Sequence, residues 1–152
     1  TVNGRARMYT PDTTVAFGIS ATLSGATPSK GNIVDVTDYQ FATFALQTGA
    51  VTDAGDATGF TTQIQESDTT ADADFTAVAD ADLIGLETEL TVVLDTKDSV
   101  AIGSIGYRGN KKYVRAVVTG STASNAIVNG MWILQGPRYA PKGDAAANIA
   151  AT

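Results

Sequence analysis

Residues Tyr113–Leu134 read YVRAVVTGSTASNAIVNGMWIL, and this stretch decides the fold class. Its first part alternates, with Val114, Ala116 and Val118 on one face, as on a β-strand. A turn rich in Gly, Ser and Asn follows, and then a second alternating segment, Ile127–Leu134. That segment is apolar on both faces, which predicts a central strand of a β-sandwich.

The rest of the chain repeats this pattern of short extended segments separated by Gly, Asn, Asp, Ser or Pro. No long amphipathic helix intervenes that could connect parallel strands. About eight antiparallel strands are therefore predicted, forming an all-β, jelly-roll-like single sandwich. The further predicted strands are Val15–Leu23, Ile33–Val36, Phe41–Thr48, Thr61–Ser67, Phe75–Val78, Leu90–Asp95 and Val100–Tyr107, with a first extended piece at Arg5–Tyr9.

Three connections have their own signatures. Ser24–Asn32 is predicted to be a loop, and Arg108–Lys111 has the Gly-Asn content of a hairpin turn. Asp80–Gly85 is predicted to be a tight or helical turn capped by Asp80.

A chain of 152 residues is long enough for one domain with a real core. The expected organisation is an N-terminal arm with the first extended segments over 1–25, the sandwich over 26–135 and a C-terminal tail over 136–152.

Charge is distributed unevenly along the chain. Fourteen of the sixteen carboxylates lie between Asp35 and Asp98, where Lys97 is the single basic residue, so this middle carries a formal charge of −13. The flanking segments hold nine basic and two acidic residues, a formal charge of +7. Like charges crowded into one segment repel one another, so the segment must be solvated or paired with cations.

Composition excludes several kinds of chemistry. The chain has no Cys and no His, so it lacks disulfides, thiolate zinc sites, imidazole ligands and the usual general base near neutral pH. A sequence pI near 4.4 argues against nucleic acid as the main partner. No apolar run approaches membrane-spanning length, and no basic stretch followed by an apolar one marks a secretory signal. We therefore predict no cofactor, no membrane partner and no enzymatic activity.

The acidic loop that holds Asp68, Asp72 and Asp74 is the candidate for metal binding. Hard cations such as Ca²⁺ take several oxygen ligands from such loops. The EF-hand pattern fails here, because counting from Asp72 puts Ala77 at the position that needs glycine. A solvated acidic loop is the simpler interpretation, and these three residues are only weak metal candidates.

Catalytic motifs are missing as well. A glycosidase needs two carboxylates across a cleft, and none of the three glutamates lies in a recognisable motif. Ser and Thr have no histidine to activate them, and neither GxSxG nor a phosphate-binding loop occurs.

Two groups of side chains could form binding surfaces. Trp132, Tyr107, Tyr113 and Tyr139 could make a sugar-stacking platform, although Trp132, Phe41, Phe44 and Phe60 are more simply explained as core. The basic residues near the Arg108 loop could bind anions. Such a group more often pairs with carboxylates, within the chain or between subunits. These residues are Arg108, Lys111, Lys112 and Arg115.

Several segments resemble a known family. They are QIQESD at Gln63–Asp68, FTAVADADLIG at Phe75–Gly85, IGY at Ile105–Tyr107, KYVR at Lys112–Arg115 and GPRYAP at Gly136–Pro141. Together they resemble small proteins from head-gene clusters of tailed bacteriophages, of the capsid decoration or cement type. Phe75 stands where many members carry Trp, so an aromatic residue is kept.

The resemblance implies a non-enzymatic virion protein on the capsid exterior, commonly a homotrimer bound to the major capsid protein. With the charge pattern, it suggests an acidic body facing solvent and basic arms facing the shell. The predicted capsid contacts are Arg5, Arg7, Arg138, Tyr139 and Lys142, because arginine forks suit contacts with carboxylates of another chain. The alternatives are a carbohydrate-binding β-sandwich module, and a structural component of the phage neck or tail.

Overall fold

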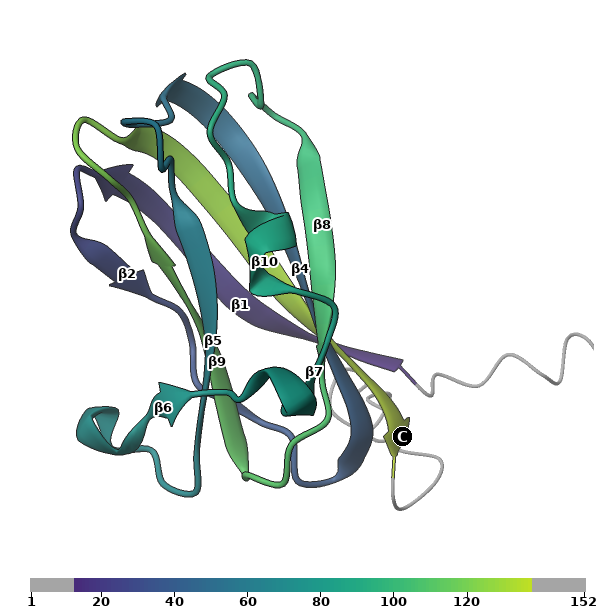
Figure 1. The fold of residues 1–152 in the computed structure, drawn as a ribbon. Helices are drawn as coiled ribbons and strands as arrows, with labels where there is room; N and C mark the ends of the chain where they lie inside the picture. Colours follow the sequence, from purple (N-terminus) through teal and green to yellow (C-terminus); the bar gives the residue numbers. More distant parts are fainter. Residues whose placement is uncertain (1–12, 138–152) are drawn as a thin grey trace, which may run out of the picture.

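The computed structural model describes residues 13–137, which form a β-sandwich of two antiparallel sheets stacked face to face (Figure 1). Sheet A has the strand order β1-β10-β4-β8-β7, and sheet B the order β2-β9-β5-β6, with β3 also paired to β9. Sheet A consists of β1 (Thr13–Ser24), β10 (Asn125–Pro137), β4 (Tyr39–Asp53), β8 (Ala101–Tyr107) and β7 (Leu83–Ile84). Sheet B consists of β2 (Pro28–Lys30), β3 (Val34–Asp35), β9 (Tyr113–Thr119), β5 (Thr61–Ser67) and β6 (Thr76–Ala77). The predicted all-β sandwich is confirmed, and jelly-roll connectivity stays a prediction.

The core lies between the sheets and is built from the inward phase of each long strand. Phe44 of β4 and Trp132 of β10 are fully buried, and their ring centroids lie 5.3 Å apart at a tilt of 52°. Phe60 is also fully buried. A Cβ on Gly130 would lie 2.3 Å from Cζ of Phe44, so β10 needs glycine where this ring packs. The predicted core role of Trp132, Phe44 and Phe60 is confirmed.

One predicted core residue was wrong. Phe41 is 53% exposed, because it has the opposite phase to Ala42 and Phe44 on β4 and therefore points out of the sandwich. The central position of β10 is confirmed, since β1 and β4 pair with it on either side. Its second apolar face, however, is not covered within residues 13–137: Met131 is 42% exposed and Ile127 39%.

Four predicted elements differ in the structure. Ser24–Asn32 is not all loop, because it contains β2. Leu90–Asp95 is not a strand: Leu90 is the last residue of the 3₁₀ helix η3 (Glu87–Leu90), and only Val92 pairs, in a single bridge to Phe60. The turn predicted over Asp80–Gly85 is helical only in the 3₁₀ helix η2 (Asp80–Asp82), its N-cap is Ala79 and not Asp80, and Leu83–Ile84 forms β7. A further 3₁₀ helix, η1 (Asp72–Asp74), lies within the acidic loop.

The fourth difference concerns the segment Arg108–Lys111, which is not a hairpin turn. It joins β8 of sheet A to β9 of sheet B, so it crosses from one sheet to the other. Its Gly-Asn content suits a sharp change of direction, but it does not pair the two strands that it connects. The loop therefore closes one end of the sandwich.

The predicted N-terminal boundary also needs correction. The segment 13–24, assigned to an arm over 1–25, is β1, which pairs with β10 from Thr13 opposite Gln135 to Ser24 opposite Asn125. A register shift between Phe17 and Ile19 places Ile19 and Leu23 in the core, although Val15 and Phe17, of the same phase in the sequence, are exposed. Residues 1–12 and 138–152, which include the predicted extended piece Arg5–Tyr9, lie outside the described residues.

Candidate functional site

The predicted capsid-contacting residues Arg5, Arg7, Arg138, Tyr139 and Lys142 all lie outside the described residues. The structure does fix where the segments that carry them join the sandwich. Thr13, at the start of β1, is paired with Gln135, close to the end of β10 (Figure 1). Both segments therefore join sheet A at the same end.

The weak metal candidates are held by cations and a hydroxyl of the protein itself. Asp68 lies 2.8 Å from Nζ of Lys111, and Asp72 lies 2.7 Å from Nζ of Lys30. Asp74 accepts a hydrogen bond from the Thr69 hydroxyl. Between residues 13 and 137, no group of three or more acidic side chains is arranged to hold a metal ion.

Arg115 fastens the acidic loop onto the outer face of sheet B. Its guanidinium is buried, donates to Asp72 Oδ1 at 2.6 Å and to Gln65 Oε1 at 2.8 Å, and lies 4.2 Å from the centre of the Phe75 ring. Hydrogen bonds from Lys30 and Arg115 hold the pKa of Asp72 below its ordinary value. The expectation that basic residues near the 108 loop serve as partners for carboxylates is confirmed for Arg115 and Lys111.

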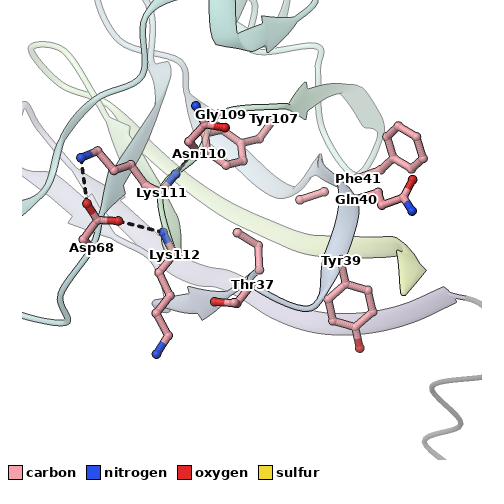
Figure 2. Close-up of a pocket in the computed structure, with 12 residues that line it drawn as sticks. Thr37, Tyr39, Gln40, Phe41, Asp68, Tyr107, Gly109, Asn110, Lys111 and Lys112 are labelled. Carbon is pink, nitrogen blue, oxygen red and sulfur yellow. Dashed lines mark hydrogen bonds and ion pairs between the residues drawn. The ribbon is translucent and has the colours of Figure 1, made fainter. Parts of the chain in front are cut away.

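A small polar pocket of about 240 Å³ lies beside the loop that joins the sheets (Figure 2). Tyr107 lines it, donating its hydroxyl to Glu66 Oε2 at 2.6 Å and accepting from the backbone N–H of Lys111 at 3.0 Å. On the other side of the loop, the Lys111 ammonium and the Lys112 backbone N–H both point to Asp68, as Figure 2 shows. The loop is thus tied to both sheets.

The chemistry of this pocket is structural. Burial, with the hydrogen bond to Glu66, raises the pKa of Tyr107 well above its ordinary value, so its hydroxyl stays protonated. The hydrogen bond from Lys111 holds the pKa of Asp68 below its ordinary value. Outside this pocket, burial raises the pKa of Glu87, and its Oε1 accepts the Ile64 backbone N–H at 2.7 Å. Each of these groups is engaged in holding the fold.

The outer face of sheet A has a different character, because it is apolar and uncharged. Across its middle, Phe17 of β1 lies beside Met131 of β10, Met131 beside Ala45 of β4, and Ala45 beside Ser104 of β8. Phe17 is 58% exposed and Val15 60%. An open groove of about 660 Å³ runs over this part of the sheet, and no Asp, Glu, Lys or Arg lines it.

The sugar-stacking platform does not form among the described aromatics. Trp132 and Tyr107 are buried, so their ring faces cannot stack on a ligand, and Tyr139 lies outside the described residues. Tyr113 is half-buried, with the Lys112 ammonium 5.2 Å from its ring centre. The exposed aromatic rings on sheet A are Phe17 and Phe41, which stand on β1 and β4 with β10 between them.

The groove residues were missed by the sequence analysis. A signal for them existed, since Ile127–Leu134 is apolar in both phases. That pattern was taken to mean burial on both faces, whereas one face lies open in the described residues. Val15 and Phe17 carry no such signal, because they alternate in phase with Ile19 and Leu23 in the sequence, and a β-bulge between Phe17 and Ile19 turns them outward.

Comparisons with known proteins add little beyond the fold. No protein-family profile matches the chain, and no curated protein sequence matches it. Among solved structures, a chain from "Bacillus endospore appendages form a novel family of disulfide-linked pili" is similar, with a TM-score of 0.41 and 16% identity. The match covers 82% of this chain and 87% of that one. A likeness at this level carries no argument about function. In residues 13–137, no helix is long and apolar enough to cross a membrane.

Proposed function

We propose that this chain is a non-enzymatic structural protein that binds the outer surface of a bacteriophage capsid, as a decoration or cement protein. One observation supports this best: the segments that carry Arg5, Arg7, Arg138, Tyr139 and Lys142 join the sandwich at the same end of sheet A. One end of the molecule can therefore present four basic residues, Arg5, Arg7, Arg138 and Lys142, to a single acidic partner surface.

The arrangement of charge in the body is consistent with this orientation. Lys111, Lys30 and Arg115 are each engaged with Asp68 or Asp72, so these cations neutralise the body itself. We assign the positive charge that meets a capsid to Arg5, Arg7, Arg138 and Lys142, and Lys97, Arg108 and Lys112 remain exposed cations of the body. Two attached segments that bind together also raise each other's effective concentration at the surface. The proposal includes a homotrimer on the major capsid protein.

The test uses heads of the encoding phage from which this protein has been removed. A variant that lacks residues 1–12 and 138–152 is compared with the full chain for occupancy on the heads. The deletion stops at residue 12 because β1, from Thr13, contributes Ile19 and Leu23 to the core. We expect loss of binding, with a cooperative thermal transition that shows the sandwich still folded.

Unchanged occupancy of a folded truncated variant would sink the proposal that these segments make the contact. Two shorter deletions, of 1–12 alone and of 138–152 alone, separate the contribution of Arg5 and Arg7 from that of Arg138, Tyr139 and Lys142. Full-length protein that binds isolated necks or tails but not heads would favour the alternative of a neck or tail component. Sedimentation of the full chain checks the trimer.

A further inference from the structure

The outer face of sheet A differs in charge from the outer face of sheet B. Among the strands of sheet A, all of them within residues 13–137, Asp53 at the end of β4 is the single charged residue. The outer face of sheet B instead carries the acidic loop and the cations that bind it. Where identical copies meet around a symmetry axis, each charge lies near copies of itself, and like charges repel. In a chain with a net charge of −6, the uncharged face is therefore the surface best suited to contact between copies.

The exposed apolar area of this face is large enough for a subunit interface. Large apolar side chains stand on it, each about half exposed; they are Val15, Phe17, Phe41, Ile84, Ile127 and Met131. Taking on the order of 200 Å² for a fully exposed side chain of this size, together they offer on the order of 600 Å². That area is at the upper end of the roughly 300–600 Å² seen for the largest apolar patch of a monomer. A stable interface takes about 800 Å² from each partner, and the small residues between these side chains can supply the remainder.

The face is bulky along one edge and hollow beside that edge. Val15 and Phe17 form a ridge on β1, which is an edge strand of the sheet. An open groove of about 660 Å³ lies next to this ridge, and small residues of β4 and β8 line it, namely Ala45, Gly103 and Ser104. A ridge and a hollow at different places on one face match in a head-to-tail contact, where the ridge of each copy enters the hollow of the next. Two copies of this face thus fit each other in shape as well as in charge.

We propose that copies of this chain associate through the outer face of sheet A, with the ridge of one copy seated in the groove of the next, over Ala45 and Ser104. Three such contacts close a ring around an axis that runs along the strands. This inference names the subunit contact of the homotrimer and therefore rests on that part of the proposed function. Rotation about the axis leaves the direction of each copy along it unchanged, so the ends where Thr13 pairs with Gln135 all lie on one side of the ring. Three copies of the terminal segments then join the sandwiches on that side, which raises their effective concentration at a capsid.

The first test places a charge in the groove of the full chain. Ala45→Lys does so without disturbing the core, because Ala45 has the outward phase of β4. The matched control is Gln63→Lys, since Gln63 is exposed on β5 of the other sheet. Sedimentation over a range of concentrations should show trimers for the parent and the control. For Ala45→Lys, the concentration needed for association should rise about a hundredfold or more, because the contact would bury an ammonium without a partner. A cooperative thermal transition shows that the variant is folded.

The second test reads the contact directly, because the chain has no cysteine of its own. Val15→Cys and Ser104→Cys are combined in one chain, on strands of sheet A that two other strands separate, about 14 Å apart. A disulfide needs Cα atoms within about 7 Å, so the two thiols cannot pair within one chain. A head-to-tail ring joins unlike positions of neighbouring copies. A short bifunctional thiol reagent should therefore give covalent trimers of the double variant on denaturing electrophoresis and leave each single variant as a monomer.

The outcomes separate this contact from the rest of the proposed function. If Ala45→Lys stays trimeric at the parent's concentrations, the face is covered by something other than a second copy, and the contact is overturned while the homotrimer stands. A parent that is monomeric at every concentration would overturn the homotrimer and this contact together, and occupancy on heads would still test capsid binding by itself. Cross-linking of the single variants, like position to like, would overturn the head-to-tail ring in favour of a two-fold pair.

Discussion

Tyr107 shows how one side chain can tie the two sheets together. It sits at the end of β8 in sheet A, and its hydroxyl reaches Glu66 on β5 of sheet B. The same oxygen accepts the Lys111 backbone N–H, which fixes the loop that crosses between the sheets. The side chain is only 4% exposed, so these hydrogen bonds are shielded from water and contribute more than they would at the surface.

Replacing Tyr107 by Phe should therefore destabilise the fold by about 1–2 kcal/mol, because Glu66 and the Lys111 N–H would each lose a partner. Urea unfolding measures the free energy of unfolding. Tyr113→Phe is the comparison, since Tyr113 is half-buried and its side chain contacts the exposed ammonium of Lys112 at the surface; its effect should stay within about 0.5 kcal/mol. Equal effects of the two substitutions would contradict the proposed role of Tyr107.

At the scale of elements, the acidic loop illustrates how crowded carboxylates are accommodated. Residues 68–75 contain Asp68, Asp72 and Asp74, yet the loop packs on sheet B. Lysines from β2 and from the loop that crosses between the sheets pair with two of these carboxylates, and Arg115 from β9 inserts beneath the loop. The repulsion expected from the sequence is offset locally by cations that are distant in sequence.

This arrangement predicts acid sensitivity. The pKa values of Asp68 and Asp72 are lowered by their hydrogen-bonded cations, so the folded state binds protons less readily than the unfolded state. Their stabilisation is fully present above the ordinary Asp pKa of 3.8 and is lost as pH falls through the lowered folded-state values. Glu87 has the opposite effect on stability. Because its pKa is raised, the folded state binds this proton at a higher pH than the unfolded state does, so acidification favours the folded state at this residue.

Thermal melting between neutral pH and strongly acidic pH should thus show a falling midpoint below the ordinary Asp range. Asp72→Asn should be less stable than the parent at neutral pH and lose less on acidification, whereas Asp82→Asn, outside these ion pairs, should follow the parent curve. If the acid dependence of Asp72→Asn equals that of the parent, the ion pairs of Asp72 with Lys30 and Arg115 do not contribute to the acid sensitivity of the fold.

Sequence patterns predicted elements well where local alternation alone determines them. Tyr113–Thr119 and Thr61–Ser67 have the predicted bounds, because each is an alternating segment that begins and ends beside turn-forming residues. The strand predicted over Leu90–Asp95 was wrong. This segment is a loop that covers part of the core and pairs with another strand at only one position, Val92. β2 is a strand that the sequence did not predict. The residues Pro-Ser-Lys have no strand signature of their own, and their pairing with β9 makes them a strand.

The candidate site was harder to predict than the fold. Which carboxylate meets which cation depends on contacts such as Arg115 with Asp72, forty-three positions apart, and local patterns carry no information about them. The apolar pattern of β10 is an ambiguous signal for the open face of sheet A, because a strand that is apolar in both phases can be covered on both faces or, as among residues 13–137, on one.

At the scale of the whole molecule, three surfaces of different character emerge. The outer face of sheet B carries the acidic loop, held by Arg115. The groove on the outer face of sheet A has no charged lining residue. One end of sheet A connects to the two terminal segments, 1–12 and 138–152. The net charge of −6 therefore averages over regions that would respond differently to a partner. Salt is the variable that separates them, since screening weakens contacts between exposed charges and leaves apolar burial largely unaffected.

If the basic flanks bind an acidic capsid surface, affinity for heads should fall several-fold as ionic strength rises from about 0.05 M to about 0.5 M. Replacing Arg5, Arg7, Arg138 and Lys142 by Gln should weaken binding at low salt and flatten this dependence. The matched control replaces three exposed basic residues of the body by Gln, namely Lys97, Arg108 and Lys112, and should leave the salt slope unchanged. Binding is measured by titrating labelled protein onto stripped heads at each ionic strength. A full salt dependence in the flank variant would assign the electrostatic attraction to the body and contradict the orientation proposed here.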